Sequence, residues 1–363
     1  MKFESILRAG LASLGGLCAF GAAAQTAVIY GRINTGIEFV DASRSPEDMS
    51  KTRLSNYRSV VGFRGDEDLG AGLKAIWQIE GGFALDTGNG SISNRDTRVG
   101  LQGGFGTVFA GVWTLPYTAA TSGFDPFYPT TAGYMALMGN GSAPTTNHLI
   151  DTTSFDRRQQ NVLQYWTPAW SGLSARLAYS PKEDTVASTG AKPSLLSASL
   201  TYDADGLVLT AAHERHDDYQ ANGTVDTASK LGAAWRFGPA RVAAVVERLE
   251  YETATGSLER NSWYVSGTWR IGSGSLRLGY ARAGDGKGSA SETVGFFRSG
   301  ADTGSSQLTV GYEHELSKRT ALFAFYSRID NERAAIYDFA INELGIAPGA
   351  RPSVVSLGMR HAF

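Results

Sequence analysis

The sequence is poor in cysteine, in proline and in long apolar runs. Its 363 residues include one cysteine, Cys18, and 11 prolines. A single cysteine leaves no intramolecular disulfide to stabilise the chain. A helical protein with several membrane spans needs several runs of about 20 apolar residues, and a mean hydropathy of -0.17 argues against them. Disulfide-rich and multi-span helical folds are therefore excluded.

The chain also lacks an excess of charge of either sign. It has 33 Lys and Arg against 35 Asp and Glu, a formal net charge of -2. Nucleic-acid-binding domains carry a basic face or tail, so we expect no nucleic-acid partner. The five histidines stand in no nucleophile motif, and His213 and His216, three apart on a strand, face opposite sides. We therefore expect no enzyme activity, no metal and no cofactor.

The N-terminal segment has the form of a secretory signal peptide. Lys2 and Arg8 precede a stretch of apolar and small residues, and Ala22-Ala23-Ala24 stands before Gln25 as an A-x-A cleavage site. We expect residues 1–24 to be removed and residues 25–363 to form a single exported domain.

Polar and apolar side chains alternate along most of the remaining chain, which is also rich in glycine, with 44 residues. The alternation is clear over 27–39, 73–80, 173–179, 262–271 and 307–313. A period of two over such lengths is typical of β-strands. The segments 241–251 and 320–329 alternate poorly, and their faces cannot be assigned from the sequence.

The connections between the strands are short and long in strict alternation. Seven are tight turns, and the other eight are long and polar, at about 41–57, 82–94, 114–155, 181–193, 216–228, 252–261, 284–305 and 330–352. Together they join 16 strands into one up-and-down meander.

This pattern predicts an all-β fold, a transmembrane antiparallel β-barrel of 16 strands with short periplasmic turns and long extracellular loops. A closed barrel is the only sheet that spans lipid, because it leaves no unpaired edge. A barrel of this size is too wide for side chains to fill, so we expect an aqueous channel. A soluble β-sandwich or propeller would not require the asymmetry of turns and loops, and no blade-length repeat is visible.

Aromatic residues gather near the short turns, as in an interfacial girdle. The girdle is expected to contain Tyr165, Trp166, Trp170, Tyr202, Trp235, Phe237 and Trp269. By alternation, few aromatic residues point inward, chiefly Tyr30 and Tyr264. This argues against an aromatic ladder for sugars along the channel.

Six segments, in order from residue 28 to the end, resemble the β-proteobacterial general porins, which are trimeric sixteen-stranded channels. They are 28–32 (Val-Ile-Tyr-Gly-Arg), 61–70, 104–108, 161–168, 316–320 and 358–363. The last strand ends at Phe363, which resembles the signal that barrel-assembly machinery reads.

The resemblance implies a homotrimer in the outer membrane of a Gram-negative bacterium. Its partners would be membrane lipid and lipopolysaccharide, the barrel-assembly machinery, and small hydrophilic solutes and ions. The third loop, 114–155, would fold into the barrel and narrow it. Where such porins commonly read Leu-Gly-Arg-Gln, this chain has Ala110-Gly111-Val112-Trp113, so one basic constriction residue is missing.

Selectivity in a wide pore comes from charged side chains at its narrowest section. The predicted pore-lining and constriction residues are Arg32, Lys74, Arg98, Arg158 and Arg176, with the acids Glu38 and Glu80 on the wall and Asp125 on the loop. Arg64 and Asp66 also point inward, but near a turn. The surplus of basic residues favours anions, with Arg32, Arg98 and Arg158 as the main candidates. The alternative for each residue is that its charge only keeps the water-filled lumen polar, as in any such barrel.

The function expected from the sequence is thus passive diffusion of small hydrophilic solutes and ions, with some preference for anions. Two alternatives stay open. One is a substrate-specific channel of the same fold, with sugar or carboxylate sites in the lumen. The other is a non-conducting barrel that acts as an adhesin.

Overall fold

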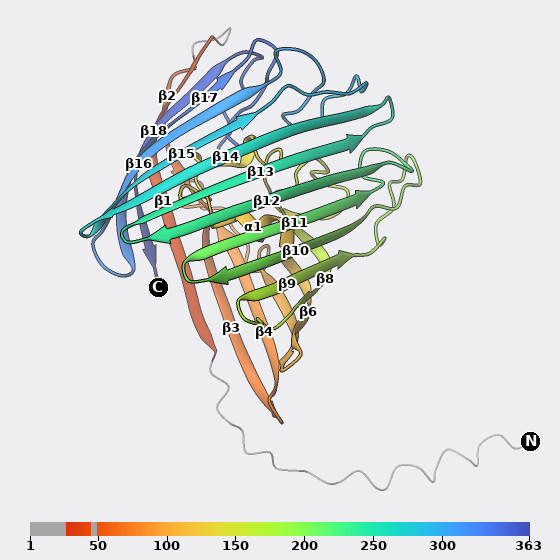
Figure 1. Cartoon of the computed structure of the whole chain (residues 1–363), viewed down its shortest axis with the longest axis vertical. Helices are drawn as coiled ribbons and strands as arrows, with labels where there is room; N and C mark the ends of the chain where they lie inside the picture. The colour runs from red at the N-terminus through yellow and green to blue at the C-terminus, as the bar shows by residue number, and fades with distance from the viewer. Residues whose placement is uncertain (1–26, 45–48) are drawn as a thin grey trace, which may run out of the picture.

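The strands form one closed antiparallel barrel in the computed structural model, which describes residues 27–44 and 49–363. Closure comes from the two ends of the chain, because β1 (Val28–Ser43) pairs with β18 (Arg351–Ala362) in continuous register. Figure 1 shows the strands running obliquely around the ring. The expected signal peptide, residues 1–24, lies outside the described residues.

Sixteen strands make up the wall within the described part of the chain, and the predicted 16-stranded barrel is confirmed. β2 (Lys51–Asn56) and β3 (Ser59–Gly70) pair in succession with β1 and count as one wall strand. β7 (Ala143–Thr146) belongs to a loop. The others are β4 (Leu73–Phe83), β5 (Thr97–Gly103), β6 (Gly106–Thr114), β8 (Arg157–Trp166), β9 (Leu173–Ser180), β10 (Ser194–Ala204), β11 (Leu207–Asp217), β12 (Val225–Phe237), β13 (Ala240–Glu252), β14 (Ser257–Ile271), β15 (Gly274–Ala283), β16 (Ser305–Glu315) and β17 (Thr320–Asn331).

Short turns lie at one end of the barrel and the longer loops at the other. The turn between β3 and β4 is held by Gly70 and Gly72, whose φ angles of 85° and 78° are left-handed and suit glycine. At the loop end, the connection between β13 and β14 is only residues 253–256, although the sequence predicted a long loop at 252–261. The polar residues there that suggested a loop extend two paired strands instead.

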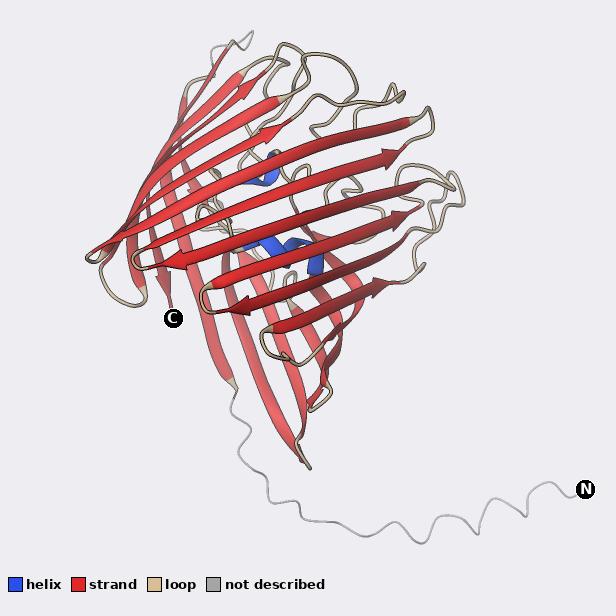
Figure 2. Cartoon of the chain, viewed as in Figure 1, coloured by secondary structure: helices blue, strands red, loops and turns tan. Residues whose placement is uncertain are grey.

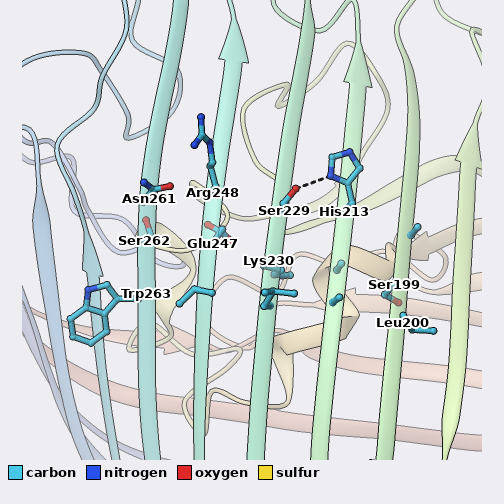
Figure 3. A pocket seen from close by; sticks show the side chains of 15 residues that line it. Ser199, Leu200, His213, Ser229, Lys230, Glu247, Arg248, Asn261, Ser262 and Trp263 are labelled. Carbon is cyan, nitrogen blue, oxygen red and sulfur yellow. Dashed lines mark hydrogen bonds between the residues drawn. The ribbon is translucent and has the colours of Figure 1, made fainter.

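Side chains on each wall strand alternate between the outer face and the interior. Figure 3 shows this across β12 to β14, at a shallow hollow of the outer wall. Arg248 and Trp263 project from the outer face, whereas Lys230 and Glu247 lie behind the strands and are buried. The outer face meets lipid and the inner face lines the lumen, as a period of two requires.

The two segments that alternate poorly in sequence have apolar residues on both faces. On β13, Val242 and Val246 are exposed on the outside, while Val245 and Leu249 are buried inside. Ile329 on β17 is likewise buried. These inner residues pack against loops folded into the barrel, so apolar residues stand among the polar ones on the lumen side of these strands and the alternation is lost.

Most of the expected aromatic girdle lies on the outer face near the turns. Trp170, Trp235 and Trp269 are exposed there by 58%, 53% and 51%. Trp166 is different, because its indole faces the lumen and stacks with arginine side chains of the inner wall. Trp166 stands two residues after Gln164, which is buried inside the barrel, and the two side chains therefore share the inner face of β8. The alternation along the strand, and not the closeness to a turn, decides where Trp166 points.

The third loop, residues 115–156, folds into the barrel and has secondary structure of its own. It contains α1 (Pro116–Ser122), a 3-10 helix (Tyr134–Ala136) and the short strand β7, which pairs in parallel with β8. Figure 2 shows the helical segments inside the ring of strands. None of the described helices has the length and apolar character needed to cross a membrane.

The seam between the ends of the chain yields a test of stability. A Cβ on Gly31 would lie 2.3 Å from the ring of Phe363 and 2.7 Å from the carbonyl oxygen of Val60. Overpacking of this kind typically costs about 1–3 kcal/mol, so we expect Gly31→Val to lower the unfolding temperature of the barrel. Gly267→Val, at an outer position with open space, is the control. Thermal unfolding followed by electrophoretic mobility measures both, and equal stability of the two variants would contradict the seam packing.

Candidate pore constriction

The tip of the third loop is fastened to the inner wall at β13 to β15. Arg241 donates to the carbonyl oxygen of Gly123 at 2.9 Å, and Ser266 to that of Phe124 at 2.6 Å. Arg277 donates to the carbonyl oxygen of Pro126 at 2.9 Å. The loop therefore rests against one side of the barrel and does not hang freely across it.

Asp125 organises the tip from inside. Its carboxylate accepts hydrogen bonds from the N–H groups of Phe127 and Tyr134, both at 2.9 Å, and from the hydroxyl of Tyr264 at 2.8 Å. Burial raises the pKa of Asp125 to about 6, against the effect of these hydrogen bonds. The predicted constriction acid is thus a buried anchor that presents no charge to the lumen.

The rest of the loop is held by buried polar and aromatic contacts. Glu247 on β13 accepts from the hydroxyl of Tyr117 at 2.9 Å and from the N–H of Gly139 at 2.7 Å. Arg260 on β14 donates to the carbonyl oxygen of Leu137 at 2.9 Å. An apolar cluster that joins the loop to the walls of β13, β14 and β17 completes the attachment.

Arg158, predicted as a main constriction cation, is buried in an ion pair. Its Nε lies 2.6 Å from an oxygen of Asp96, and its Nη2 lies 2.9 Å from the hydroxyl of Thr114. Burial alone would raise the pKa of Asp96, but the charge and hydrogen bond of Arg158 outweigh burial and lower it. The carboxylate stays ionised, and the pair contributes little net charge to the lumen.

The predicted wall acids are also occupied by basic partners. Glu38 is fully buried and accepts from Arg53 at 2.8 Å and from Tyr57 at 2.8 Å. Glu80 accepts from Arg95 at 3.0 Å and from the hydroxyl of Tyr30 at 3.0 Å. Each carboxylate thereby loses its attraction for cations in the channel.

Lys74 lies away from this region. It forms an exposed ion pair with Asp66 at 2.9 Å, one strand across and close to the turn that joins β3 to β4. An exposed pair of this kind is worth little in stability. The pair places Lys74 near the turn end of the barrel.

Arg32 lies beside the loop tip with two further arginines, Arg360 on the adjacent strand β18 and Arg277 on β15. A hollow of about 60 Å³ between the wall and residues 126–130 is lined by Arg32, Arg277 and Arg360. Arg32 donates to a backbone carbonyl oxygen at 3.2 Å. Arg277 and Arg360 both bind Glu313, Arg360 at 2.9 Å.

Three arginines on the neighbouring wall stack on aromatic rings. The guanidinium carbon of Arg98 lies 4.3 Å from the ring centroid of Trp113, and that of Arg176 lies 4.5 Å from the centroid of Trp166. Arg64 lies 5.1 Å from the centroid of Tyr30. Within the described part of the chain, none of the three arginines forms an ion pair.

Several charged groups of this region escaped the sequence analysis. Arg360 stands on the polar face of a strand whose alternation is clear, so the same pattern that selected Arg98 could have found it. Arg58 lies in the break between β2 and β3, and Arg95 lies in the loop before β5. No periodic pattern covers those two positions, and only the three-dimensional structure places them at the lumen.

Comparison with known proteins identifies the chain's relatives. A family model described as Gram-negative porin matches residues 10–334. Outer membrane porin protein 32 of Delftia acidovorans is 28% identical over 98% of this chain and 100% of its own length. Major outer membrane protein P.IB of Neisseria gonorrhoeae is 28% identical over 45% of each chain.

Solved structures agree with this. The anion-selective porin from Comamonas acidovorans superposes with a TM-score of 0.78 at 25% identity, over 93% of this chain and 100% of that chain. OmpT of Vibrio cholerae, at 14% identity and a TM-score of 0.68 over 95% of this chain and 99% of that one, shares the fold.

The pair of Arg158 and Asp96 can be tested by removing the acid alone. In Asp96→Asn, Arg158 loses its counter-charge. We expect the reversal potential of the channel in a salt gradient to move towards the equilibrium potential of the anion. Because the pKa of Asp96 is lowered, acid should reproduce the effect only below the ordinary range of an aspartate. Asp66→Asn, which breaks the exposed pair with Lys74, is the matched control and should change the potential less. An unchanged potential in Asp96→Asn would mean that the pair does not border the ion path.

Proposed function

Since the chain belongs to the Gram-negative porin family, we propose that its channel favours anions and that it works as a homotrimer. The channel itself follows from the family and the fold. The protein lies in the outer membrane, where its barrel lets small hydrophilic solutes and ions diffuse passively through a water-filled lumen.

The anion preference is carried by the unequal pairing of lumen charges. Glu38, Glu80 and Asp96 are each bound by an arginine. Arg98 and Arg176 have no such partner within the described residues and face the lumen. The uncompensated charge near the loop is therefore positive, and a lumen of that sign concentrates anions. The likeness to an anion-selective porin supports the same preference.

A reversal-potential measurement tests the preference. We expect the refolded protein in a planar bilayer under a salt gradient to give a potential of the anion-selective sign. Arg98→Glu should shift it towards cation selectivity, because a free positive charge becomes negative at the wall. Arg248→Glu, the same exchange on the outer face, should leave it unchanged. A cation-selective wild-type channel would overturn the proposal, and no shift in Arg98→Glu would remove Arg98 from the ion path.

The homotrimer is supported by the family resemblance, and an outer hollow near the seam is the contact face that we propose for it. A shallow hollow of about 470 Å³ there is bordered by outward side chains of β1, β2, β17 and β18. Ile37, Leu54 and Leu357 are exposed on this face by 50%, 49% and 55%. Chemical cross-linking in the membrane should give a trimer, and channel closures should come in threes. A monomer in both measurements would contradict this proposal alone.

We further propose that residues 1–24 are cleaved on export and that Phe363 serves as the assembly signal. Phe363 bonds with Gly31 through both backbone groups, at 3.0 Å and 3.1 Å, and is 42% exposed on the outside. These contacts place the last residue at the closing seam, where an assembly factor can reach it. Lipopolysaccharide contacts and the barrel-assembly machinery belong to the same proposal.

A further inference from the structure

We propose that the inner wall of β5, β6, β8 and β9 holds a binding site for aromatic carboxylates, formed by Arg98 and Arg176 with Trp113 and Trp166. The inference rests on the proposed channel function, and it names a class of solute that the channel would bind in passing. Arg64, stacked on Tyr30 nearby, adds a third positive charge.

The aromatic part of the site is a compact group of three rings. Phe109 packs edge-on against Trp113 with centroids 5.1 Å apart and against Trp166 at 5.0 Å, and the two indoles are 5.8 Å apart. Phe109 is only 2% exposed and supports the indoles from behind. The indoles themselves are half-buried, so the polar lumen has an apolar surface at this point.

Arg98 lies against all three rings. Its guanidinium carbon is 4.3 Å from the centroid of Trp113, 4.8 Å from that of Phe109 and 5.2 Å from that of Trp166. Stacking occupies the face of a guanidinium and leaves its N–H groups, which lie in the plane, free to donate. Arg176, 4.5 Å from Trp166, is held in the same way and is exposed.

Two of the three nitrogen donors of Arg98 are buried without a partner. Its Nε and Nη1 make no hydrogen bond to any described residue and are shielded from solvent. An unsatisfied buried donor is unfavourable, and the cost is greater for a charged group. Arg158 and Arg95, on the same side of the lumen, have carboxylates at 2.6 Å and 3.0 Å. No described carboxylate binds Arg98 in this way. An incoming carboxylate that displaced the side chains over these donors would satisfy them.

The three arginines also repel one another. Arg64 pairs in register with Gln78, which pairs with Arg98, so the two arginines stand two strands apart in one row. Neighbouring strands are about 4.8 Å apart, which puts the charges within a Debye length. The positive charges of Arg176 and Arg64 also act on Arg98, against the attraction of the nearby Asp96. A bound anion relieves this repulsion, and a cation would increase it.

The combination selects the chemistry of the ligand. A carboxylate fits the planar fork of a guanidinium through two parallel hydrogen bonds. A planar ring attached to that carboxylate reaches the half-buried indoles and covers apolar surface that water otherwise contacts. Small inorganic anions can bind only the guanidinium groups, and neutral aromatic molecules can pack only against the indole rings. Benzoate, which satisfies both, is the simplest probe.

The test is the effect of benzoate on chloride current through the full-length refolded protein. We expect benzoate to reduce single-channel conductance in a saturable way, whereas acetate and benzyl alcohol at equal concentration do so far less. Arg98→Gln and Trp113→Val should each weaken the apparent affinity for benzoate by about tenfold or more, as expected for loss of a charge-assisted hydrogen bond or an aromatic contact. Arg98→Lys keeps the positive charge but loses the planar pair of N–H donors. The variant should therefore retain anion selectivity and lose the inhibition of the current by benzoate.

The controls are exchanges of the same kinds on the outer face, Arg248→Gln and Trp263→Val, which should bind benzoate as the wild type does. Comparison of benzoate with acetate on the wild type needs no variant and stays decisive if a variant fails to fold. Equal block by both anions would overturn the aromatic site, as would a benzoate effect that never saturates. Either result with anion selectivity intact leaves the proposed function standing, whereas a cation-selective wild type would overturn that function.

Discussion

An unpaired backbone amide or carbonyl in lipid costs several kcal/mol, and this constraint governs the whole molecule. β1 and β18 meet in register from Arg32 with Ala362 to Ser43 with Arg351, so no edge strand is left in the wall. Once the backbone is satisfied in this way, the outer face needs only apolar side chains. The inner face does not contact lipid, so it can hold the charged side chains and the inserted loop that determine the width and the electrostatics of the lumen.

The net charge that the lumen presents depends on which charged side chains form ion pairs as much as on how many of each sign there are. Glu38 and Asp96 each face an arginine at hydrogen-bond distance, and Asp125 uses its charge to bind backbone N–H groups of the loop. The acids thus serve as structural anchors. Arg98 and Arg176, which have no carboxylate partner among the described residues, lie on one side of the lumen, where Trp113 and Trp166 hold them in place. A chain with a net charge of -2 can therefore present a positive wall to a passing solute.

The period of two predicted the strands and the inward-facing side chains of Arg32, Arg98 and Arg176, because alternation is a local property of a strand between lipid and water. The alternation of short turns with long loops predicted the barrel and its strand number. It could not predict partners. Arg158 is paired by Asp96, 62 residues away, and no local pattern connects the two. Parity could also have placed Trp166 in the lumen, but its position next to a turn suggested the girdle instead. Where loops cover the inner wall, as at Val245 and Ile329, the alternation itself disappears.

The hydrogen bonds between Gly31 and Phe363 join residues from the two ends of the described chain, and this has a consequence for biogenesis. A nascent or truncated chain without β18 has two free sheet edges, β1 and β17, both ready to pair with any other strand. The barrel therefore cannot close before β18 is present, and until then both edges stay open to pairing with other strands.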